Sequence, residues 1–335
     1  MRTHVERDIV VLGASGGGVE ALTRLLGSLP VDLRAAVFVV LHVSPGAPPV
    51  LAKVLARATK LPVRTATDGE PIVAGTVLVA PPDRHLMLTA DHVVLDGGPT
   101  QNRVRPAIDA LFRSAAVCLG ARVIGAVLTG SLSDGSAGLA AIKRCGGLAI
   151  VQEPADAAFP DMPRNAIDAD SPDLVLPLAE IARHIAAAVG QRAAVVPTPI
   201  ELQLEAAPGL RTGASVETND RIGRRAALTC PDCGGPLWRL DGEPVRYRCQ
   251  IGHAYAEEVL LAAKTEGAVQ ALQIAVRTLE ERAHLLATMA EQDRLAARTL
   301  TGAQLMTRQA ELLDAARTLR ELLHAMSALD TSDRG

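Results

Sequence analysis

Aromatic side chains are scarce in this chain of 335 residues, which has one Trp, two Tyr and three Phe. Its cores must therefore be packed from Ala, Leu, Val and Ile, and a hydrophobic fraction of 48% is ample for a large core. The formal net charge of −3 gives no electrostatic case for binding nucleic acid. No apolar run reaches the ~20 residues of a membrane span, and the N-terminus lacks the apolar segment of a signal peptide. We therefore expect no membrane insertion and a cytoplasmic location.

Cysteine is also uncommon, with five in the chain. Cys118 and Cys145 fall beside predicted strands and are expected to be small buried residues. The other three cysteines form a C-x₂-C-x₁₅-C-x₃-H pattern together with one histidine: Cys230, Cys233, Cys249 and His253. Disulfide pairing is not indicated, which is typical of a reducing compartment.

The spacing of this pattern is close to that of a zinc ribbon. Between the two pairs of candidate ligands, Asp241-Gly242 separates two short alternating runs and predicts a β-hairpin. Four protein ligands close the coordination shell of zinc, so the expected metal is structural rather than catalytic. Reduced exposed thiols and a redox pair are the alternative interpretations.

The most informative segment is a buried strand that runs through a glycine-rich turn into a helix, at residues 8–26. Gly13–Gly17 fits the G-x-S-x-G elbow and puts Ser15 at a helix N-terminus, where an oxyanion is stabilised. The same letters also satisfy a weak dinucleotide fingerprint, G-x-G-x-x-A, over Gly16–Ala21. A purely structural turn is the third interpretation.

The next strand favours the nucleophile. A dinucleotide site expects an acidic residue at the end of the second strand, whereas the strand at 36–41 ends in His42, a candidate general base. A further strand at 123–128 leads into a loop that carries Asp134, which by itself reads equally as a loop or N-cap aspartate. Together the three residues have the composition of a hydrolytic triad. We expect Ser15 Oγ close to His42 Nε2, and His42 Nδ1 close to a carboxylate oxygen of Asp134.

The remaining pattern predicts an α/β fold with a doubly wound, mostly parallel sheet in a three-layer αβα arrangement. The predicted strands are 8–12, 36–41, 76–80, 123–128 and 148–151, and the predicted helices lie near 17–28, 48–58, 106–119, 137–145 and 178–189. Shorter runs within 72–95 suggest an antiparallel excursion. The predicted domains are 1–190, a linker at 191–227, the zinc-ribbon-like module at 228–255 and a helical region at 256–330.

Two apolar stripes at helical spacing mark the C-terminal region and predict an antiparallel helical hairpin or a dimeric coiled coil. The first stripe contains Val269, Leu272, Val276, Leu279, Ala283, Leu286 and Ala290, and the second contains Leu305, Leu312, Ala316, Leu319, Leu323 and Met326. Gly302 lies between the two stripes. Self-packing is one interpretation, and association with a helical receptor, a signalling partner or a second subunit is the other.

Residues 8–190 resemble the catalytic domain of the CheB family, the protein-glutamate methylesterases that act on chemotaxis receptors. Six stretches in one order carry the resemblance: 13–22, 39–45, 80–86, 105–116, 128–138 and 162–167. The resemblance implies a serine hydrolase that converts glutamyl methyl esters on receptor-like proteins to glutamate and methanol, and that also deamidates certain glutamines. By motif position, Ser15 is the nucleophile, His42 its base and Asp134 the group that orients the imidazole, with no cofactor needed for catalysis.

The backbone N–H groups of Gly16 and Ser131 are our candidate oxyanion donors. Both loops depart from the family pattern. Gly16 stands where the family usually has threonine, and Ser131-Leu132 replaces Met-Gly. A leucine in place of glycine is expected to shift the loop or narrow access to it.

The first catalytic strand begins within about ten residues of Met1, which leaves no room in this sequence for the receiver domain of chemotaxis relatives. Phosphorylation in cis is therefore not the expected switch. Two other classes of function stay open: an inactive adaptor that binds a signalling partner through its C-terminal tail, and a nucleotide-binding α/β protein that uses the glycine loop.

Overall fold

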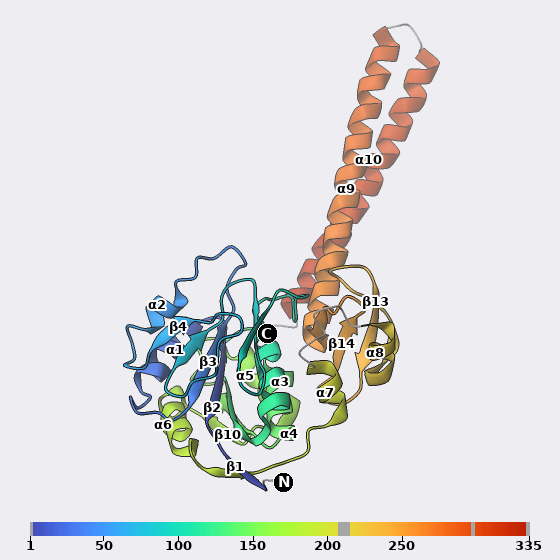
Figure 1. Cartoon of the computed structure of the whole chain (residues 1–335). Coiled ribbons are helices and arrows are strands. Elements are labelled where there is room, and N and C mark those ends of the chain that lie inside the picture. The colour runs from blue at the N-terminus through green and yellow to red at the C-terminus, as the bar shows by residue number, and fades with distance from the viewer. Residues whose placement is uncertain (1–2, 207–214, 296–298, 333–335) are drawn as a thin grey trace. The chain divides into compact units, whose positions relative to one another are not determined.

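The computed structural model describes residues 3–206, 215–295 and 299–332. The chain divides into two compact units, Met1–Leu260 and Leu261–Gly335 (Figure 1). Residues 207–214, in the predicted linker, lie outside the described residues.

A seven-stranded sheet forms the centre of the first unit, in the order β10-β9-β8-β2-β3-β5-β4, and every neighbouring pair is parallel. The strands are β2 (Ile9–Ala14), β3 (Ala36–Leu41), β4 (Val63–Thr65), β5 (Val77–Val79), β8 (Val123–Val127), β9 (Leu148–Gln152) and β10 (Leu174–Leu176). The predicted doubly wound parallel sheet is confirmed. The sequence pattern missed β4 and β10, because runs of three residues give no clear periodicity.

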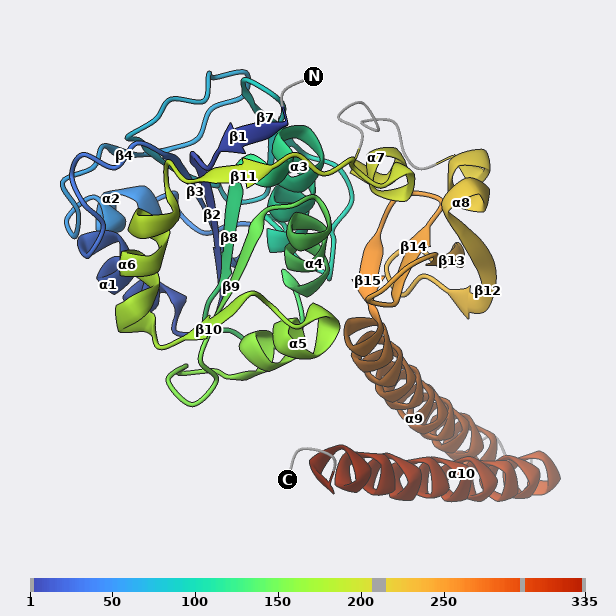
Figure 2. The ribbon, with the colours of Figure 1, turned by 90° about the horizontal axis from the view of Figure 1, so that it is seen from below.

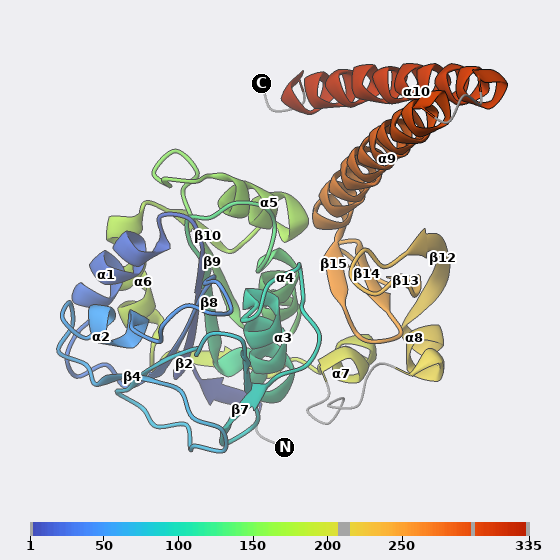
Figure 3. The ribbon, with the colours of Figure 1, turned by 90° about the horizontal axis from the view of Figure 1, so that it is seen from above.

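Helices cover both faces of this sheet and give the three-layer arrangement (Figures 2 and 3). One face carries α1 (Gly18–Gly27), α2 (Leu51–Leu55) and α6 (Leu178–Ala188); the other carries α3 (Ile108–Leu119), α4 (Ser136–Arg144) and α5 (Asp161–Asp170). A one-turn 3₁₀ helix (Gly120–Arg122) leads into β8. Each face buries its own apolar core, built mainly from Leu, Ile, Val and Ala as the scarcity of aromatics requires.

Two antiparallel ribbons flank the sheet. The predicted excursion is formed by β6 (His85–Leu88) and β7 (Val93–Asp96), whereas β5 joins the parallel sheet. At the other end, β1 (His4–Glu6) pairs with β11 (Arg192–Ala194).

A separate antiparallel sheet follows, in the order β12-β13-β14-β15. It consists of β12 (Gly223–Thr229), β13 (Pro236–Leu240), β14 (Arg246–Cys249) and β15 (Ala254–Ala256), preceded by α7 (Ile200–Ala206) and α8 (Val216–Ile222). The predicted hairpin corresponds to β13 and β14, while α7, α8 and most of β12 fall in the segment predicted as a linker. Leu237 and Tyr255 belong to the small core of this sheet. Trp238, the next residue of β13, is also buried and donates its indole N–H to Asp220 of α8. We call residues 223–256 the C-terminal module.

A buried ion cluster joins the C-terminal module to the parallel sheet's domain. Glu205 of α7 lies 3.3 Å from Nη1 of Arg113 on α3 and also pairs with Arg246 of β14. Burial alone disfavours the Glu205 carboxylate, but the positive charges of Arg113 and Arg246 outweigh it and lower the pKa of Glu205 to about 2. The module is therefore docked against α3 through paired charges.

The second unit contains most of α9 (Glu257–Leu295) together with α10 (Thr299–Ser332), which form the predicted helical hairpin. Four residues of the predicted stripes are buried, namely Val276, Ala283, Ala290 and Ala316, and so is Ala263 near the start of α9. Gly302 lies inside α10 and not between the helices, because one glycine costs a helix only about 1 kcal/mol.

In the described part of the chain, α9 is also the one helix long and apolar enough to cross a membrane, with an 18-residue window of mean hydropathy 1.2. The expectation that no run qualifies was therefore too strict. Core helices of soluble proteins meet the same criterion, so the finding by itself assigns no membrane span.

We expect Glu205→Gln to lower the free energy of unfolding by about 3–5 kcal/mol at pH 7, because it leaves two arginines buried without their counter-ion. The folded-state pKa of Glu205 is depressed, so its stabilisation is present above pH 4.5 and is lost as the pH falls toward 2. Urea unfolding of both proteins across this range should show the difference shrinking with acid.

The matched control is Glu201→Gln on the same helix, whose carboxylate pairs with the more exposed Arg144. This change should cost less than about 1 kcal/mol. Equal losses in the two variants would contradict a special role for the buried cluster.

Candidate functional site

The strand-turn-helix at the start of the sheet positions Ser15. The Ser15 N–H donates to the carbonyl of Thr129 (3.0 Å), and the Gly18 N–H donates to the carbonyl of Ser15 (2.8 Å). Gly17 has a φ of 71°, which suits glycine, and α1 begins at the next residue. The turn therefore holds Ser15 at the N-terminus of a helix and at the carboxyl ends of β2 and β8.

Strand register brings His42 beside Ser15. Ala14 of β2 pairs with Leu41 of β3, and the His42 N–H donates to the Ala14 carbonyl (3.2 Å). Ser15 and His42 are thus the next residues beyond two paired parallel strands. Because β3 lies on one side of β2 and β8 on the other, the site is at the switch point of the sheet, where α/β proteins bind ligands.

Asp134 completes the cluster. Its Oδ2 lies 2.7 Å from Nε2 of His42, and its side chain is 3% exposed. The same oxygen accepts the N–H of Ile108 (2.6 Å), while Oδ1 accepts from Nδ2 of Asn102 (2.9 Å) and from the N–H of Asp109 (3.3 Å). The carboxylate therefore sits at the N-terminus of α3, where the helix dipole favours a negative charge.

This setting decides the charge of Asp134. Burial by itself raises the pKa of a carboxyl group, but the hydrogen bonds from His42, Asn102 and Ile108 outweigh it and hold the pKa of Asp134 below its ordinary value. Asp134 is therefore an anion at neutral pH.

The nitrogen assignment differs from the expected one. We expected Nδ1 of His42 to face Asp134, whereas Nε2 does so. Asp134 reaches the ring from the N-terminus of α3, and the nitrogen without a hydrogen bond among the described residues is Nδ1. The Ser15 hydroxyl also makes no hydrogen bond among these residues, so Ser15 and His42 are not joined by a direct hydrogen bond.

The sequence analysis missed two polar residues of this site. Nδ2 of Asn102 bridges the carboxylates of Asp134 and Asp109, at 2.9 Å and 3.0 Å. Burial and the nearby charge of Asp134 raise the pKa of Asp109 to about 6, although Arg113 opposes this. The signal was the acidic residue inside the 105–116 stretch, but spacing along the chain does not reveal that it lies against Asp134.

The two candidate oxyanion donors differ from their neighbour Gly130. The Gly130 N–H already donates to the carbonyl of Phe159 (3.0 Å), whereas the N–H groups of Gly16 and Ser131 have no partner within the described part of the chain. Both free N–H groups lie on loops at the carboxyl ends of the strands that meet at Ser15.

The two departures from the family pattern have structural explanations. A Cβ on Gly16 would lie 2.9 Å from the ring of Phe159, so a larger residue at this position would require that ring to move. Leu132 keeps a φ of 65°, so the leucine adopts the left-handed backbone that a glycine would take there. This backbone conformation is strained for leucine.

Two exposed apolar side chains lie at the edge of the site. Leu132 is 48% exposed and Phe159 is 46% exposed. The carbonyl of Leu132 accepts from Nδ2 of Asn165 (2.8 Å), which holds the loop in place. Leu132 and Phe159 therefore form an apolar rim next to the Ser15 turn.

A second candidate site lies in the C-terminal module. The ligand atoms of Cys230, Cys233, Cys249 and His253 all lie within 4.8 Å of one another. A tetrahedral zinc ion with bonds of about 2.3 Å to sulfur and 2.0 Å to nitrogen separates its ligand atoms by about 3.5–3.8 Å.

The observed separations fit that geometry. They are 3.7 Å between Sγ of Cys233 and Cys249, 3.7 Å between Cys230 Sγ and His253 Nδ1, and 3.4 Å between Cys249 Sγ and the same nitrogen. A disulfide needs sulfur atoms about 2.05 Å apart, and all five cysteines are free. The Cys/His cluster is thus able to hold a metal ion.

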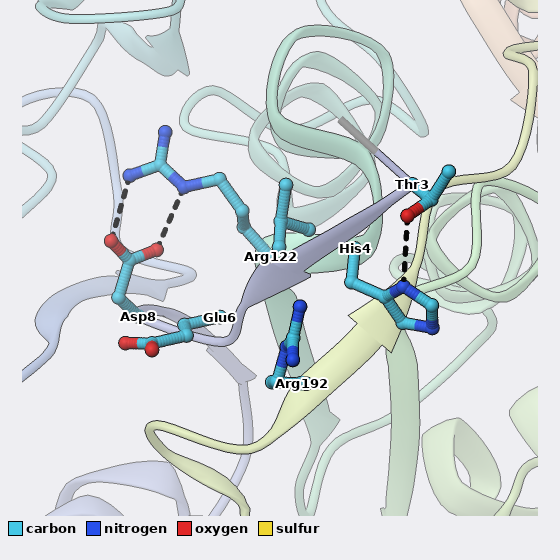
Figure 4. Close-up of a pocket in the computed structure, with 7 residues that line it drawn as sticks. Thr3, His4, Glu6, Asp8, Arg122 and Arg192 are labelled. Carbon is cyan, nitrogen blue, oxygen red and sulfur yellow. Dashed lines mark hydrogen bonds and ion pairs between the residues drawn. The ribbon is translucent and has the colours of Figure 1, made fainter. Parts of the chain in front are cut away.

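An open hollow of about 860 Å³ lies elsewhere. It is lined by the β1–β11 ribbon together with Asp8 and Arg122, which precede β2 and β8 (Figure 4). Arg122 pairs with Asp8 through two hydrogen bonds of 2.8 and 2.9 Å. The hollow is therefore at the amino ends of the strands, opposite the Ser15–His42–Asp134 cluster.

Comparisons with known proteins agree with this geometry. The model of the CheB methylesterase family matches residues 10–185. The crystal structure of the Thermotoga maritima CheB methylesterase catalytic domain is 34% identical, with a TM-score of 0.53, and covers 55% of this chain and 100% of its own. Its match does not extend over the whole of this chain.

Curated relatives carry one description. A protein-glutamate methylesterase/protein-glutamine glutaminase of Symbiobacterium thermophilum is 38% identical over 56% of this chain and 52% of its own length. A putative one of Leptospira interrogans is also 38% identical, over 52% of this chain and 91% of its own. The chain spans about half the length of the first curated relatives. With more than half of its residues matched by the family model, the chain belongs to the CheB methylesterase family.

Proposed function

We propose that this protein is a serine hydrolase that removes methyl groups from glutamyl methyl esters on receptor-like proteins, and that it also deamidates glutamine. The hydrogen bond of 2.7 Å between His42 and Asp134 carries the proposal, because it orients an imidazole beside Ser15 in a member of the CheB family. An adaptor without catalysis would not need to maintain this buried, charged arrangement.

In the proposed reaction, Ser15 Oγ attacks the ester carbonyl while Nδ1 of His42 accepts its proton. Asp134 stabilises the imidazolium through Nε2, and the N–H groups of Gly16 and Ser131 bind the oxyanion. His42 then returns the proton to the leaving methanol. A water molecule, activated by the same histidine, hydrolyses the acyl-enzyme and releases the glutamate side chain. With a glutamine substrate the product is again glutamate, and the leaving group is ammonia in place of methanol.

The apolar rim supports a protein substrate. Leu132 and Phe159 offer exposed apolar surface next to the nucleophile. Exposed apolar surface beside a site is typical of a surface that contacts another protein. A small free ester would leave the rim in water.

We further propose that the Cys/His cluster holds a structural zinc ion. All four positions of the coordination shell are protein ligands, so the metal would fix the fold of the small module and take no part in hydrolysis. The three cysteine ligands must be thiolates, which requires reduced cysteines and favours the cytoplasm.

Replacing Ser15 by Ala should lower the hydrolysis of a glutamyl methyl ester by roughly 10⁴-fold or more, because the attacking oxygen is lost. The rate of methanol release and labelling by a fluorophosphonate probe both measure this. Ser44→Ala, which changes an exposed serine near His42, is the control and should retain both signals. Retained hydrolysis in Ser15→Ala would refute the proposed nucleophile.

Leu132→Gly should relieve the left-handed backbone cost of about 1–2 kcal/mol, and the greater entropy of glycine offsets about half of it. A net gain of up to about 1 kcal/mol in the free energy of unfolding is expected. Leu132→Ala keeps the strain and should show no gain. Both variants should turn over a small ester normally but show a raised KM for a methylated protein, which kinetics with the two substrates will test.

Metal analysis should find one zinc ion per chain. Cys233→Ser removes an exposed ligand and should weaken zinc binding by at least tenfold, whereas Cys118→Ser, outside the cluster, should leave it unchanged. Equal zinc content in the two variants after dialysis against a chelator would contradict the assigned ligands.

A further inference from the structure

Asn102 connects the active-site carboxylate to the C-terminal module. On one side, its Nδ2 donates to Asp134 and to Asp109. On the other side, its Oδ1 accepts the N–H of Ala256 (2.8 Å), and its own N–H donates to the carbonyl of Ala254 (2.7 Å). The side chain is nearly buried, at 6% exposed for the residue.

These contacts fix the orientation of the Asn102 amide. Turning the amide over would place its oxygen against two carboxylates and its NH₂ group against a backbone N–H, which is unfavourable on both sides. Strand β15 therefore supplies the Ala256 N–H that holds Nδ2 toward Asp134, and the Ala254 carbonyl that holds the main chain of Asn102.

Strand β15 is in turn tied to the Cys/His cluster. It begins directly after His253 and pairs with β14, which ends at Cys249. Between the two alanines that contact Asn102, the buried hydroxyl of Tyr255 lies 3.0 Å from Sγ of Cys230. Three of the four candidate ligands thus contact or adjoin the strand that holds Asn102.

Further contacts join the same two regions. The hydroxyl of Thr100 donates to Asp232, which lies between Cys230 and Cys233 (3.1 Å). The hydroxyl of Ser133, next to Asp134, donates to Glu258 just beyond β15 (3.2 Å). The module therefore contacts the Asn102 loop, and the first turn of α9, which follows the module, contacts the Asp134 loop.

We propose that Asn102 is a positioning residue for Asp134, and that the metal-bound C-terminal module holds Asn102 in place through β15, so that metal occupancy controls the esterase. The inference rests on the proposed function and on the proposed metal. Without the module, the Asn102 side-chain amide loses the N–H of Ala256, its main chain loses the carbonyl of Ala254, and the amide is free to turn. The two carboxylates then lose their shared donor, and His42 loses a fixed partner.

Three signals test the link in the full-length protein. Trp238 is the one tryptophan of the chain and is buried in the module, so its fluorescence reports the state of the module. Acylation of Ser15 by a fluorophosphonate reports the active site. The downfield proton resonance of His42 Nε2–H reports its hydrogen bond to Asp134 and needs no turnover.

Removing zinc with a chelator should change Trp238 fluorescence, lower the acylation rate on the order of 10²-fold and abolish the His42 resonance. Adding zinc chloride should restore all three signals. The proposal is overturned if Trp238 reports an opened module while the acylation rate and the His42 resonance stay unchanged. Unchanged Trp238 fluorescence in a zinc-free protein would refute control by the metal.

Variants separate positioning from packing. Asn102→Ala should acylate slowly even with zinc bound, and chelation should lower its rate no further although Trp238 still responds. Asn102→Asp, which adds a third carboxylate, should be slower than Asn102→Ala; a role in packing alone predicts the reverse order. If chelation lowers the acylation rate of Asn102→Ala by the same factor as in the wild type, the module acts by a route other than Asn102.

Two more variants test β15 itself. Ala256→Pro removes the N–H that Asn102 accepts, so it should slow acylation with zinc present. Thr100→Val removes a contact with the module outside β15 and should keep the wild-type response to zinc. If zinc-loaded wild-type protein is not acylated at Ser15, the proposed function fails, and the His42 resonance still decides the coupling.

Discussion

Burying a carboxylate is costly unless hydrogen-bond donors surround it. The proposed active site is organised around the buried carboxylate of Asp134, which has such donors. His42, Asn102 and two backbone N–H groups at the start of α3 point at its two oxygens. These donors come from three separate parts of the chain. Asp134 therefore joins the end of β3, the start of α3 and the loop before α3 to the loop after β8, and the position of the histidine depends on all of them.

The neighbouring Asp109 makes the arrangement asymmetric. Burial and the charge of Asp134 raise the pKa of Asp109 to about 6, while Asp134 keeps its charge. Asn102 donates to both and so lowers their mutual repulsion. An amide at this position does what a second histidine or a hydroxyl would do less well, because its one NH₂ group has two donors and no charge.

The C-terminal module is bound to the catalytic domain by interactions that are costly to break. Glu205, Arg113 and Arg246 are buried together, and β15 adds backbone hydrogen bonds to Asn102. The matched Thermotoga maritima structure is a catalytic domain, and it covers 55% of this chain. The family model matches residues 10–185, so the module lies outside the matched segment, and it contacts the asparagine that donates to Asp134.

The sequence by itself determined the parallel arrangement of the longer strands, the covering helices other than α5, and the Cys/His spacing, and it predicted Ser15, His42 and Asp134 as neighbours. Each of these is recorded in local order: buried runs of five or six residues, a glycine turn after a strand, or a fixed ligand spacing. Only the tertiary structure decided that Nε2 of His42 faces Asp134, that Asp109 and Asn102 belong to the site, and that β15 contacts Asn102. The physical reason is that these contacts join residues as much as 154 positions apart, and their hydrogen bonds form only after separate elements have packed.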